Sequence, residues 1–332
     1  MASIKIEIGG ILLFCDESIA KLNIGNGYII EKMLYEDLFY KDKVKSQDHE
    51  FLIDYYDSLL PNDSIDSFMC IRKNDRIEVN VKEEINRLRG IKNPIFFEES
   101  LNDYKVQEME YLNMVFRLIR IFKAGNFGPV DLFFVYDCQP LNILHQKYNV
   151  RHIFAGRNVF DERSFSLSLN EQIDCQRFIE RYSDGAYDLL KNPINQFILG
   201  LERMGEYGGY LEFIIVLEML LLKSSDGKKQ PLANRIAMLL GNSEEEIKKI
   251  YDRACKHYEN RSKIIHEGDS SGVSLDDRID LEEMTRRVLK YALERCREKL
   301  NENSSLEWAQ IKNSMIEDLK SKVTCAKDEG IL

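Results

Sequence analysis

Apolar residues in the second half of the chain recur at three- and four-residue steps, the spacing of an amphipathic helix. The clearest run covers about residues 244–266. Ser243 and Glu246 have the spacing of a capping box, and Gly268 is a natural helix stop. One apolar face is formed by Ile247, Ile250, Tyr251, Ala254, Cys255 and Tyr258. This pattern predicts one long helix.

Three further segments have helical patterns. Residues 211–222 are almost wholly apolar but too short to span a bilayer, which is typical of the central helix of a bundle. Residues 231–240 predict a shorter helix that begins with proline and ends before Gly241, and residues 280–300 predict another amphipathic helix. Short connections between four or more helices indicate an antiparallel bundle.

The first half of the chain mixes strand and helix patterns. Residues 4–8 alternate apolar and polar side chains, and Gly9-Gly10 after them indicate a turn. Apolar residues on one face of residues 102–123 predict a helix. Further strands are predicted at residues 11–14, 27–30, 68–71, 77–81, 132–136 and 150–154. We therefore expect an α+β domain in this half.

These patterns divide the chain into three parts. Residues 1–164 are expected to form the α+β domain, residues 165–302 an all-α antiparallel helical bundle, and residues 303–332 an accessory helix with a disordered end. The sequence Gly25-x-Gly27 in the first part is not a nucleotide-binding loop, because no Gly-Lys-Ser/Thr follows it. From its position alone, we expect the first part to be a sensor or regulatory domain.

Composition narrows the class of protein. The 332 residues show no secretory signal and no apolar run long enough for a membrane span, which predicts a cytoplasmic protein without membrane association. The seven cysteines are scattered, odd in number and without a C-x2-C pair, which argues against a zinc site and against a disulfide framework. We therefore expect reduced thiols, no metal and no cofactor.

Arg261 and His266 form an Arg-x4-His element near the end of the long predicted helix. Arginine is a permanent cation whose planar fork of donors fits a phosphate. Histidine titrates near neutral pH and can give or take a proton. The two residue types suit RNA cleavage without a metal, although two such residues at this spacing also arise often by chance.

Three blocks of sequence make a more specific pattern around this element. They are Leu217-Glu218, Asn234-Arg235-Ile236-Ala237 with Leu239-Leu240, and Tyr258-x2-Arg261-Ser262-x3-His266-Glu267-Gly268. In the order and approximate spacing of these blocks, the chain from about residue 165 to residue 300 resembles an Apea-like HEPN domain. The resemblance implies a metal-independent endoribonuclease that acts as a homodimer, with a role in abortive infection or antiphage defence.

The resemblance also implies a mechanism. The ribose 2′-OH attacks the adjacent phosphate and leaves a 2′,3′-cyclic phosphate and a 5′-OH, which requires a base, an acid and stabilisation of the phosphoryl charge. We assign proton transfer to His266 and phosphate binding to Arg261. One histidine cannot be base and acid at once, so two chains are expected to line one shared cleft.

Helical geometry constrains how these two residues cooperate. Five residues on an ideal helix rotate by roughly 140°. The two side chains therefore share a site only if the helix frays before His266 or if a partner chain completes the arrangement.

Other residues of the matching blocks are candidates for supporting roles. Glu218 lies in an apolar run, and a buried carboxylate needs a partner, for which Arg235 and Arg261 are the candidates. That pair is either structural or orients the arginine. Ser262 either hydrogen-bonds the substrate or faces water, and Tyr258 fits core packing better than catalysis.

Charge gives a mixed indication about nucleic acid. The net charge of −10 counts against a broad nucleic-acid-binding surface. The segment from Lys248 to Lys263, however, contains six basic residues and only two acidic ones. We expect Arg253, Lys256 and Lys263 to contact RNA, with an ordinary solvated helix face as the alternative. His257 lies on another face and is expected to be solvated.

The leading hypothesis is a cytoplasmic, dimeric, metal-independent endoribonuclease with an N-terminal regulatory region. Its expected partners are an RNA substrate, with tRNA as one candidate, a second copy of the chain and a phage-derived trigger protein. The alternative is a catalytically inactive HEPN bundle that binds a protein or a nucleotide. A third hypothesis, chemistry on a bound nucleotide, is disfavoured because the chain lacks a glycine-rich phosphate loop.

Overall fold

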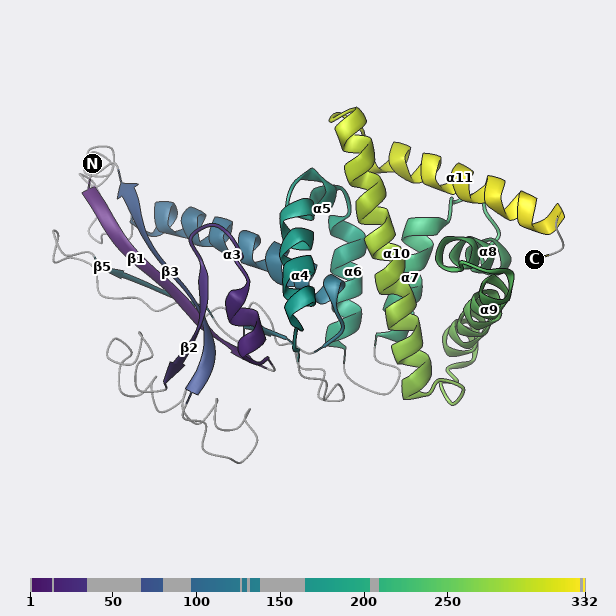
Figure 1. The fold of residues 1–332 in the computed structure, drawn as a ribbon, viewed down its shortest axis with the longest axis horizontal. Coiled ribbons are helices and arrows are strands. Elements are labelled where there is room, and N and C mark those ends of the chain that lie inside the picture. Colours follow the sequence, from purple (N-terminus) through teal and green to yellow (C-terminus); the bar gives the residue numbers. More distant parts are fainter. Residues whose placement is uncertain are drawn as a thin grey trace. The chain divides into compact units, whose positions relative to one another are not determined.

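The computed structural model (Figure 1) describes residues 2–13, 15–34, 67–79, 97–125, 127–129, 132–137, 165–203, 209–328 and 331. The chain forms two compact units. Within the described residues, the division falls between Phe116 and Arg117 in one helix and between Arg177 and Phe178 in another. Two helices therefore contribute to both units, whereas the sequence predicts one boundary after residue 164.

The first unit contains a five-stranded sheet. Its strands are β1 (Ala2–Leu13), β2 (Ile29–Leu34), β3 (Ser67–Val79), β4 (Gly128–Pro129) and β5 (Phe133–Asp137). The order is β2-β3-β1-β4, with β5 also paired to β1, and every pairing is antiparallel. A 3-10 helix, η1 (Glu17–Lys21), follows β1 in the sequence.

Two details of the predicted strands are wrong. The turn expected at Gly9-Gly10 is absent, since β1 continues through both glycines and pairs them with Arg72 and Ile71 of β3. The two strands expected at residues 68–71 and 77–81 are one continuous strand, β3. Pairing with neighbouring strands satisfies the glycine backbone, and this tertiary context outweighs the local preference of glycine for turns. The strand predicted at residues 150–154 lies outside the described residues.

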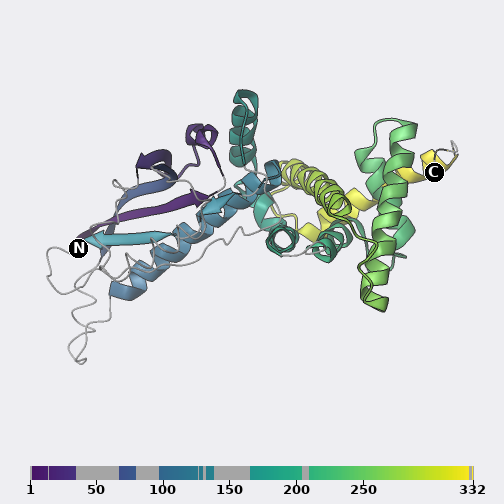
Figure 2. The ribbon, with the colours of Figure 1, turned by 90° about the horizontal axis from the view of Figure 1, so that it is seen from below.

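Helix α3 (Phe97–Phe122) lies along one face of the sheet, as Figure 2 shows. Its side chains Val115 and Phe116 are fully buried, and so is Ile8 of β1, while Ile6 is nearly so. From Ser3 to Ile8 of β1, buried positions alternate with more exposed ones, the period expected of a strand with one covered face. The predicted helix is confirmed and begins at Phe97 instead of residue 102.

A buried polar cluster joins α3 to the turn that precedes β2. The Glu108 carboxylate accepts hydrogen bonds from Tyr28 at 2.7 Å, from Asn26 at 3.0 Å and from Lys73 at 2.8 Å. Asn26 has a φ of 50° and lies between two glycines that share this left-handed conformation. Asparagine tolerates that backbone, and its side chain anchors the turn. Because these groups satisfy one another, the cluster has a structural role in the first unit.

The second unit is helical. It contains the end of α3, the last five residues of α4 (Leu169–Tyr182), α5 (Gly185–Leu189), α6 (Lys191–Glu202), α7 (Tyr210–Leu221), α8 (Lys229–Leu240), α9 (Glu244–Glu267), α10 (Leu275–Glu302) and α11 (Trp308–Asp328). Helix α7 contacts α6, α8, α9, α10 and α11, which confirms the predicted central helix. An α+β region followed by an all-α region is thus confirmed. None of the described helices combines the length and apolar character that crossing a bilayer requires.

Capping groups set the helix boundaries. Ser243 accepts a hydrogen bond from the Glu246 backbone N–H at the start of α9, and Gly268 ends the helix with a φ of 68°, as the sequence predicts. Helix α10 begins at Leu275 instead of residue 280, because Ser274 and Asp277 form a capping box. Aspartate in place of the usual glutamate makes this box harder to recognise. Helix α11 confirms the accessory helix, whereas most of the end predicted to be disordered lies outside the described residues.

Helix α10 carries charged side chains into the core of the second unit. Arg278, Glu282 and Arg286 follow one another at four-residue steps and are at most 2% exposed. The Glu282 carboxylate lies 2.5 Å from Arg286 and 3.9 Å from Arg278. Each guanidinium also lies over an aromatic ring, Phe213 of α7 for Arg278 and Phe197 of α6 for Arg286. Buried charge is tolerated here because it is paired and stacked.

We expect Glu282→Gln to destabilise the protein by about 3–5 kcal/mol, because two buried guanidinium groups lose their shared carboxylate. Urea unfolding followed by circular dichroism measures this change. The control is Glu283→Gln. Glu283 also bonds Arg286, at 2.7 Å, but is 52% exposed, and exposed pairs contribute about 0–1 kcal/mol. Equal losses in the two variants would show that the buried pair does not hold α10 in place.

Two glycines allow α6 and α7 to approach each other closely. Gly209, the residue before α7, has a φ of 83°, and a Cβ there would lie 1.9 Å from the carbonyl oxygen of Gly200. A Cβ on Gly200 would lie 2.6 Å from the ring of Phe213. The contact between these helices therefore depends on the absence of side chains at both positions.

Gly209→Ala is expected to lower the free energy of unfolding by at least about 2 kcal/mol, because it combines a left-handed backbone with a clash against a backbone oxygen. Thermal denaturation measures the loss. The control is Gly227→Ala, where a Cβ meets nothing within 4 Å and the change should stay within about 1 kcal/mol. If both variants melt together, the close approach of α6 and α7 is not a constraint on the fold.

Candidate functional site

Arg261 and His266 lie in the last two turns of α9. The helix stays regular through Glu267 and does not fray before His266. Side chains five positions apart therefore project about 140° apart. The guanidinium and the imidazole of one chain do not meet on one face of the helix. The sequence allows either fraying of the helix before His266 or completion of the site by a partner chain. The unbroken helix leaves only the second arrangement open.

The Arg261 side chain is turned toward α7. Its Nη2 lies 3.7 Å from Oε1 of Glu218, and its guanidinium carbon lies 5.4 Å from the ring centre of Tyr258. Only 16% of the Arg261 side chain is exposed. Glu218 also lies 3.9 Å from Lys228. Of the two partners that the sequence offers for Glu218, Arg261 is therefore the one that pairs with it.

This ion pair is held by charge and not by a hydrogen bond. The separation of 3.7 Å is longer than a hydrogen bond. Glu218 Oε1 is buried and accepts no hydrogen bond from the described residues. A guanidinium bound in this loose way keeps donors that a phosphate can use, since arginine carries five of them in one plane.

Tyr258 lies beside the same pair. Burial raises the pKa of its hydroxyl, Arg261 opposes that shift and Glu218 adds to it. The hydroxyl is therefore protonated at neutral pH and cannot act as a base there. This position agrees with the packing role that the sequence favours, and the role itself stays a prediction.

Arg235 is not a partner of Glu218. It donates hydrogen bonds to the Asp226 carboxylate at 2.7 Å and to the Leu221 carbonyl oxygen at 2.5 Å, and it is buried. The hydrogen bond from Arg235 lowers the pKa of Asp226. The arginine joins the end of α7 and the following turn to α8, and those nearer acceptors satisfy its charge. Its position indicates a structural role.

His266 is exposed and forms no hydrogen bond or ion pair with another described residue. Lys263 and Ile265 beside it are also exposed, Ile265 by 48%. Ser262 is half-buried, and its two alternatives stay open. An exposed imidazole is available to exchange a proton with a substrate.

Most of the positive charge on α9 is paired. Arg253 lies 2.6 Å from Asp280, and Lys256 lies 2.6 Å from Asp277. Of the three predicted RNA-binding residues, only Lys263 forms no ion pair with a described residue. Arg253 and Lys256 are about half exposed, and a phosphate can compete for such pairs because they are weak. RNA contact by these three residues stays a prediction.

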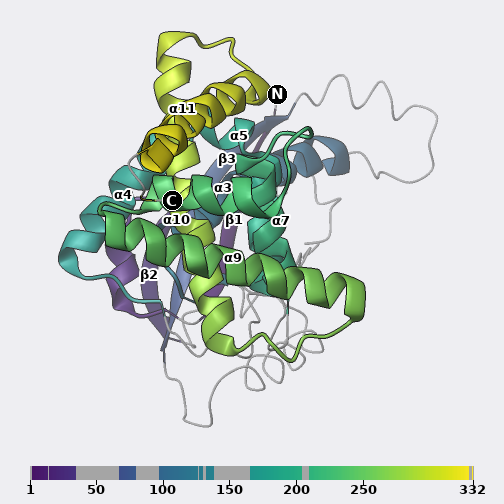
Figure 3. The same ribbon diagram turned by 90° about the vertical axis from the view of Figure 1, so that its right-hand side faces the viewer.

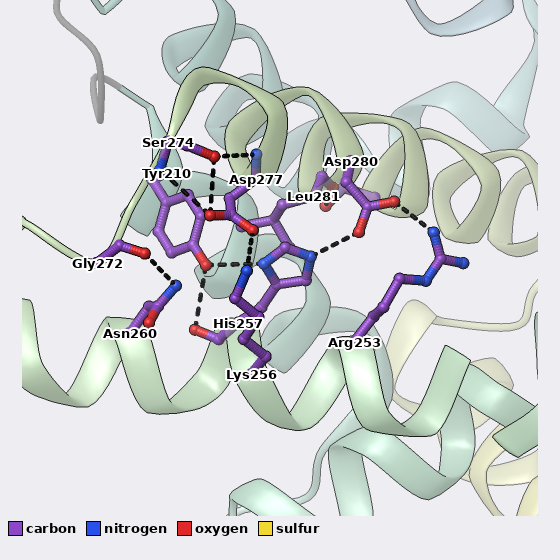
Figure 4. A network of polar contacts seen from close by, with 11 residues as sticks. Tyr210, Arg253, Lys256, His257, Asn260, Gly272, Ser274, Asp277, Asp280 and Leu281 are labelled. Carbon is purple, nitrogen blue, oxygen red and sulfur yellow. Dashed lines mark hydrogen bonds and ion pairs between the residues drawn. The ribbon is translucent and has the colours of Figure 1, made fainter. Parts of the chain in front are cut away.

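His257 is buried, and the expectation that it is solvated is wrong. Figure 4 shows its imidazole between Tyr210 and Asp280. Nδ1 lies 2.8 Å from the Tyr210 hydroxyl of α7, and Nε2 lies 2.8 Å from the Asp280 carboxylate of α10. A search for apolar spacing misses this residue, because the face of α9 toward α10 is polar.

The polar face of α9 follows helical spacing. It consists of Arg253, Lys256, His257 and Asn260. Asn260 donates a hydrogen bond to the Gly272 carbonyl oxygen at 3.1 Å, in the connection to α10. Figure 3 shows α9 lying across the start of α10. The pair Asp277 and Asp280, three residues apart at the start of the next helix, is the sequence feature that could have indicated this contact.

The two aspartates are held as carboxylates. Burial raises the pKa of Asp280, but the His257 hydrogen bond and the Arg253 charge outweigh burial, so the pKa lies below its ordinary value. Burial likewise raises the pKa of Asp277, and hydrogen bonds from Lys256 and from the capping box reverse the shift. Both groups are therefore charged at neutral pH, which keeps the contacts between α9 and α10 intact.

Comparison with known proteins adds no family to this picture. No family model matches the chain, and no curated protein or solved structure is significantly similar to it. The described residues contain no group of three or more histidine, cysteine, aspartate or glutamate side chains that could hold a metal ion. The resemblance to HEPN domains rests on Arg261, His266 and the blocks around them, and it stays a prediction.

The contacts of Asp280 predict a dependence of stability on pH. Its pKa is lower in the folded than in the unfolded chain, so its contribution is present above the ordinary value of 3.8 and is lost as the pH falls through the folded value. Asp280→Asn is expected to cost about 1–3 kcal/mol at neutral pH, because the buried His257 loses a charged acceptor. Urea unfolding at neutral pH and at about pH 3, below the ordinary value of 3.8, measures how much of this contribution is lost.

The control for this experiment is Asp276→Asn, an exposed residue in the first turn of the same helix. We expect little change from it at either pH. The same loss for Asp280→Asn at both pH values would contradict a lowered pKa in the folded chain.

Proposed function

We propose that this chain is a metal-independent endoribonuclease of the HEPN type. The supporting observation is the end of α9. There Arg261 forms an ion pair with Glu218 that contains no hydrogen bond, and its guanidinium lies over the ring of Tyr258. His266 is exposed on the same unbroken helix. A phosphate clamp and a proton-transfer group are the two functions that this chemistry requires.

In the proposed reaction, the ribose 2′-oxygen attacks the adjacent phosphorus. The new bond from the 2′-oxygen to phosphorus forms while the bond to the 5′-oxygen breaks, which leaves a 2′,3′-cyclic phosphate and a 5′-OH. A histidine takes the 2′-OH proton, and an acid gives a proton to the leaving 5′-oxygen. Arg261 stabilises the charge on the phosphoryl oxygens.

A second copy of the chain supplies the missing group. Arg261 and His266 project about 140° apart on an unbroken helix, and one chain offers one Arg-x4-His histidine. A homodimer brings two such histidines to one phosphate, so that one acts as base and the other as acid. We propose that α9 lies at this interface.

The biological setting is part of the same proposal. The substrate is a cellular RNA, with tRNA as one candidate, and the protein acts in the cytoplasm as an antiphage or abortive-infection effector. The first unit senses a trigger, for which a phage-derived protein is the proposed source. These assignments follow from the resemblance of residues around Arg261 and His266 to HEPN domains.

A second candidate function is an inactive HEPN bundle that binds a protein or a nucleotide. It is favoured by the ion pairs of Arg253 and Lys256, which reduce the charge available to RNA on α9. This alternative predicts no cleavage of any RNA and a partner complex that is insensitive to substitution of His266.

Arg261→Ala and His266→Ala are each expected to lower RNA cleavage by about 10²–10⁴-fold, because each removes one of the two groups that the reaction needs. The assay uses purified protein with total cellular RNA or tRNA in EDTA, and it identifies 2′,3′-cyclic phosphate ends. Lys248→Ala, an exposed change on the same helix, is the matched control and should cut like the wild type. Cleavage by His266→Ala at the wild-type rate would exclude the assigned role.

A further inference from the structure

The polar face of α9 determines where the candidate catalytic residues point. His257 precedes Arg261 by four residues and His266 by nine. Each residue of an α-helix turns by about 100°, so Arg261 projects about 40° from His257 and His266 about 180° from it. Because α9 is unbroken over this stretch, a contact that fixes the direction of His257 also fixes the directions of both other side chains.

His257 is fixed from two sides by other helices. Tyr210 of α7 and Asp280 of α10 each lie 2.8 Å from one of its ring nitrogens. The rings of His257 and Tyr210 also meet edge to face, with centres 5.8 Å apart. Tyr210 is 0% exposed and His257 2%, so RNA cannot reach the imidazole. A buried histidine held in this way cannot transfer protons to a substrate, but it can hold a helix in one orientation.

We propose that the Tyr210–His257–Asp280 network sets the rotation of α9 and thereby directs Arg261 and His266. His257 is then a positioning residue, which touches neither the substrate nor the reacting atoms. The effect on catalysis rests on the proposed function, whereas the effect on the rotation of α9 does not.

The network keeps its hydrogen bonds in both protonation states of His257. With a neutral imidazole, Nε2–H donates to Asp280 and the Tyr210 hydroxyl donates to Nδ1. With an imidazolium, Nδ1–H donates to the Tyr210 oxygen, and the hydroxyl proton turns to the His257 carbonyl oxygen at 3.4 Å. The Tyr210 hydroxyl is therefore the group that can either donate to the imidazole or accept from it, and both arrangements hold α9 in the same orientation.

The other charged groups near the imidazole are already paired. Lys256 pairs with Asp277, and Arg253 pairs with Asp280. The charged residues that the structure describes on α7 and α8 pair away from the imidazole. These are Glu212, Glu218, Lys229 and Arg235. Among the described residues, the side-chain partners of the imidazole are therefore Tyr210 and Asp280.

The test compares two tyrosine variants of the full chain. Tyr210→Phe removes only the hydroxyl from the network. Tyr187→Phe is the matched control, because Tyr187 is also buried and its hydroxyl binds Arg117 at 3.2 Å, away from α9. Hydrogen–deuterium exchange of residues 258–274 is measured at neutral pH in both variants and in the wild type. The kcat and KM for RNA cleavage are measured beside it.

Relative to the control, we expect Tyr210→Phe to raise exchange in this segment about tenfold, since local opening becomes easier. The kcat should fall about tenfold while KM stays within about twofold, which a general loss of stability would not produce. Equal exchange and equal kcat in the two variants would overturn the proposal.

Two further variants keep the test decisive if Tyr210→Phe does not fold. His257→Gln retains a donor toward Asp280, and His257→Asn retains a polar group toward Tyr210. In each variant, the exchange rate should lie between that of the wild type and that of a protein that has lost both contacts of His257. Wild-type exchange rates in both variants would overturn the proposal. Where wild type cuts no RNA, the proposed function fails, and the exchange comparison alone decides this inference.

Discussion

The second unit depends on one carboxylate, Glu282, that lies in its interior between Arg278 and Arg286. Removing charge from water is costly, so the core around α10 has to supply partners on every side. It does so with aromatic rings from α6 and α7 and with the backbone carbonyl of Arg120, which accepts a hydrogen bond from Arg286 at 3.2 Å. Because these buried contacts come from three other helices, α10 has little freedom to slide along its axis or to rotate about it.

The order imposed on α10 extends to the end of α9. Asp277 and Asp280 lie at the start of the same helix, within one turn of Arg278, and they receive Lys256 and His257 from α9. A series of contacts therefore connects the buried ion pair of α10 to the polar interface between α9 and α10. That interface in turn sets the direction in which the Arg261 side chain points. Apolar packing holds the bundle together, but polar contacts determine the rotation of the helix that carries the candidate site.

Sequence patterns predicted the elements that depend on local spacing. The apolar period, Ser243 and Gly268 were sufficient for α9. A carboxylate in an apolar run was sufficient to expect that Glu218 pairs with Arg235 or Arg261, and the structure pairs it with Arg261. Predictions failed where distant segments decide. Gly9 is held in β1 by its neighbours, and His257 is buried by groups that lie 47 and 23 residues away along the chain. No local pattern contains that information.

The unbroken end of α9 has a consequence for how the proposed enzyme responds to its own abundance. No bend between Arg261 and His266 brings the two side chains to one face of α9. Under the proposed mechanism, an isolated chain would therefore have no complete site. Under the same proposal, helices from two chains have to meet before RNA is cut. Below the dissociation constant of the dimer, the rate of cleavage then rises with the square of the chain concentration, and a cell with few copies is spared.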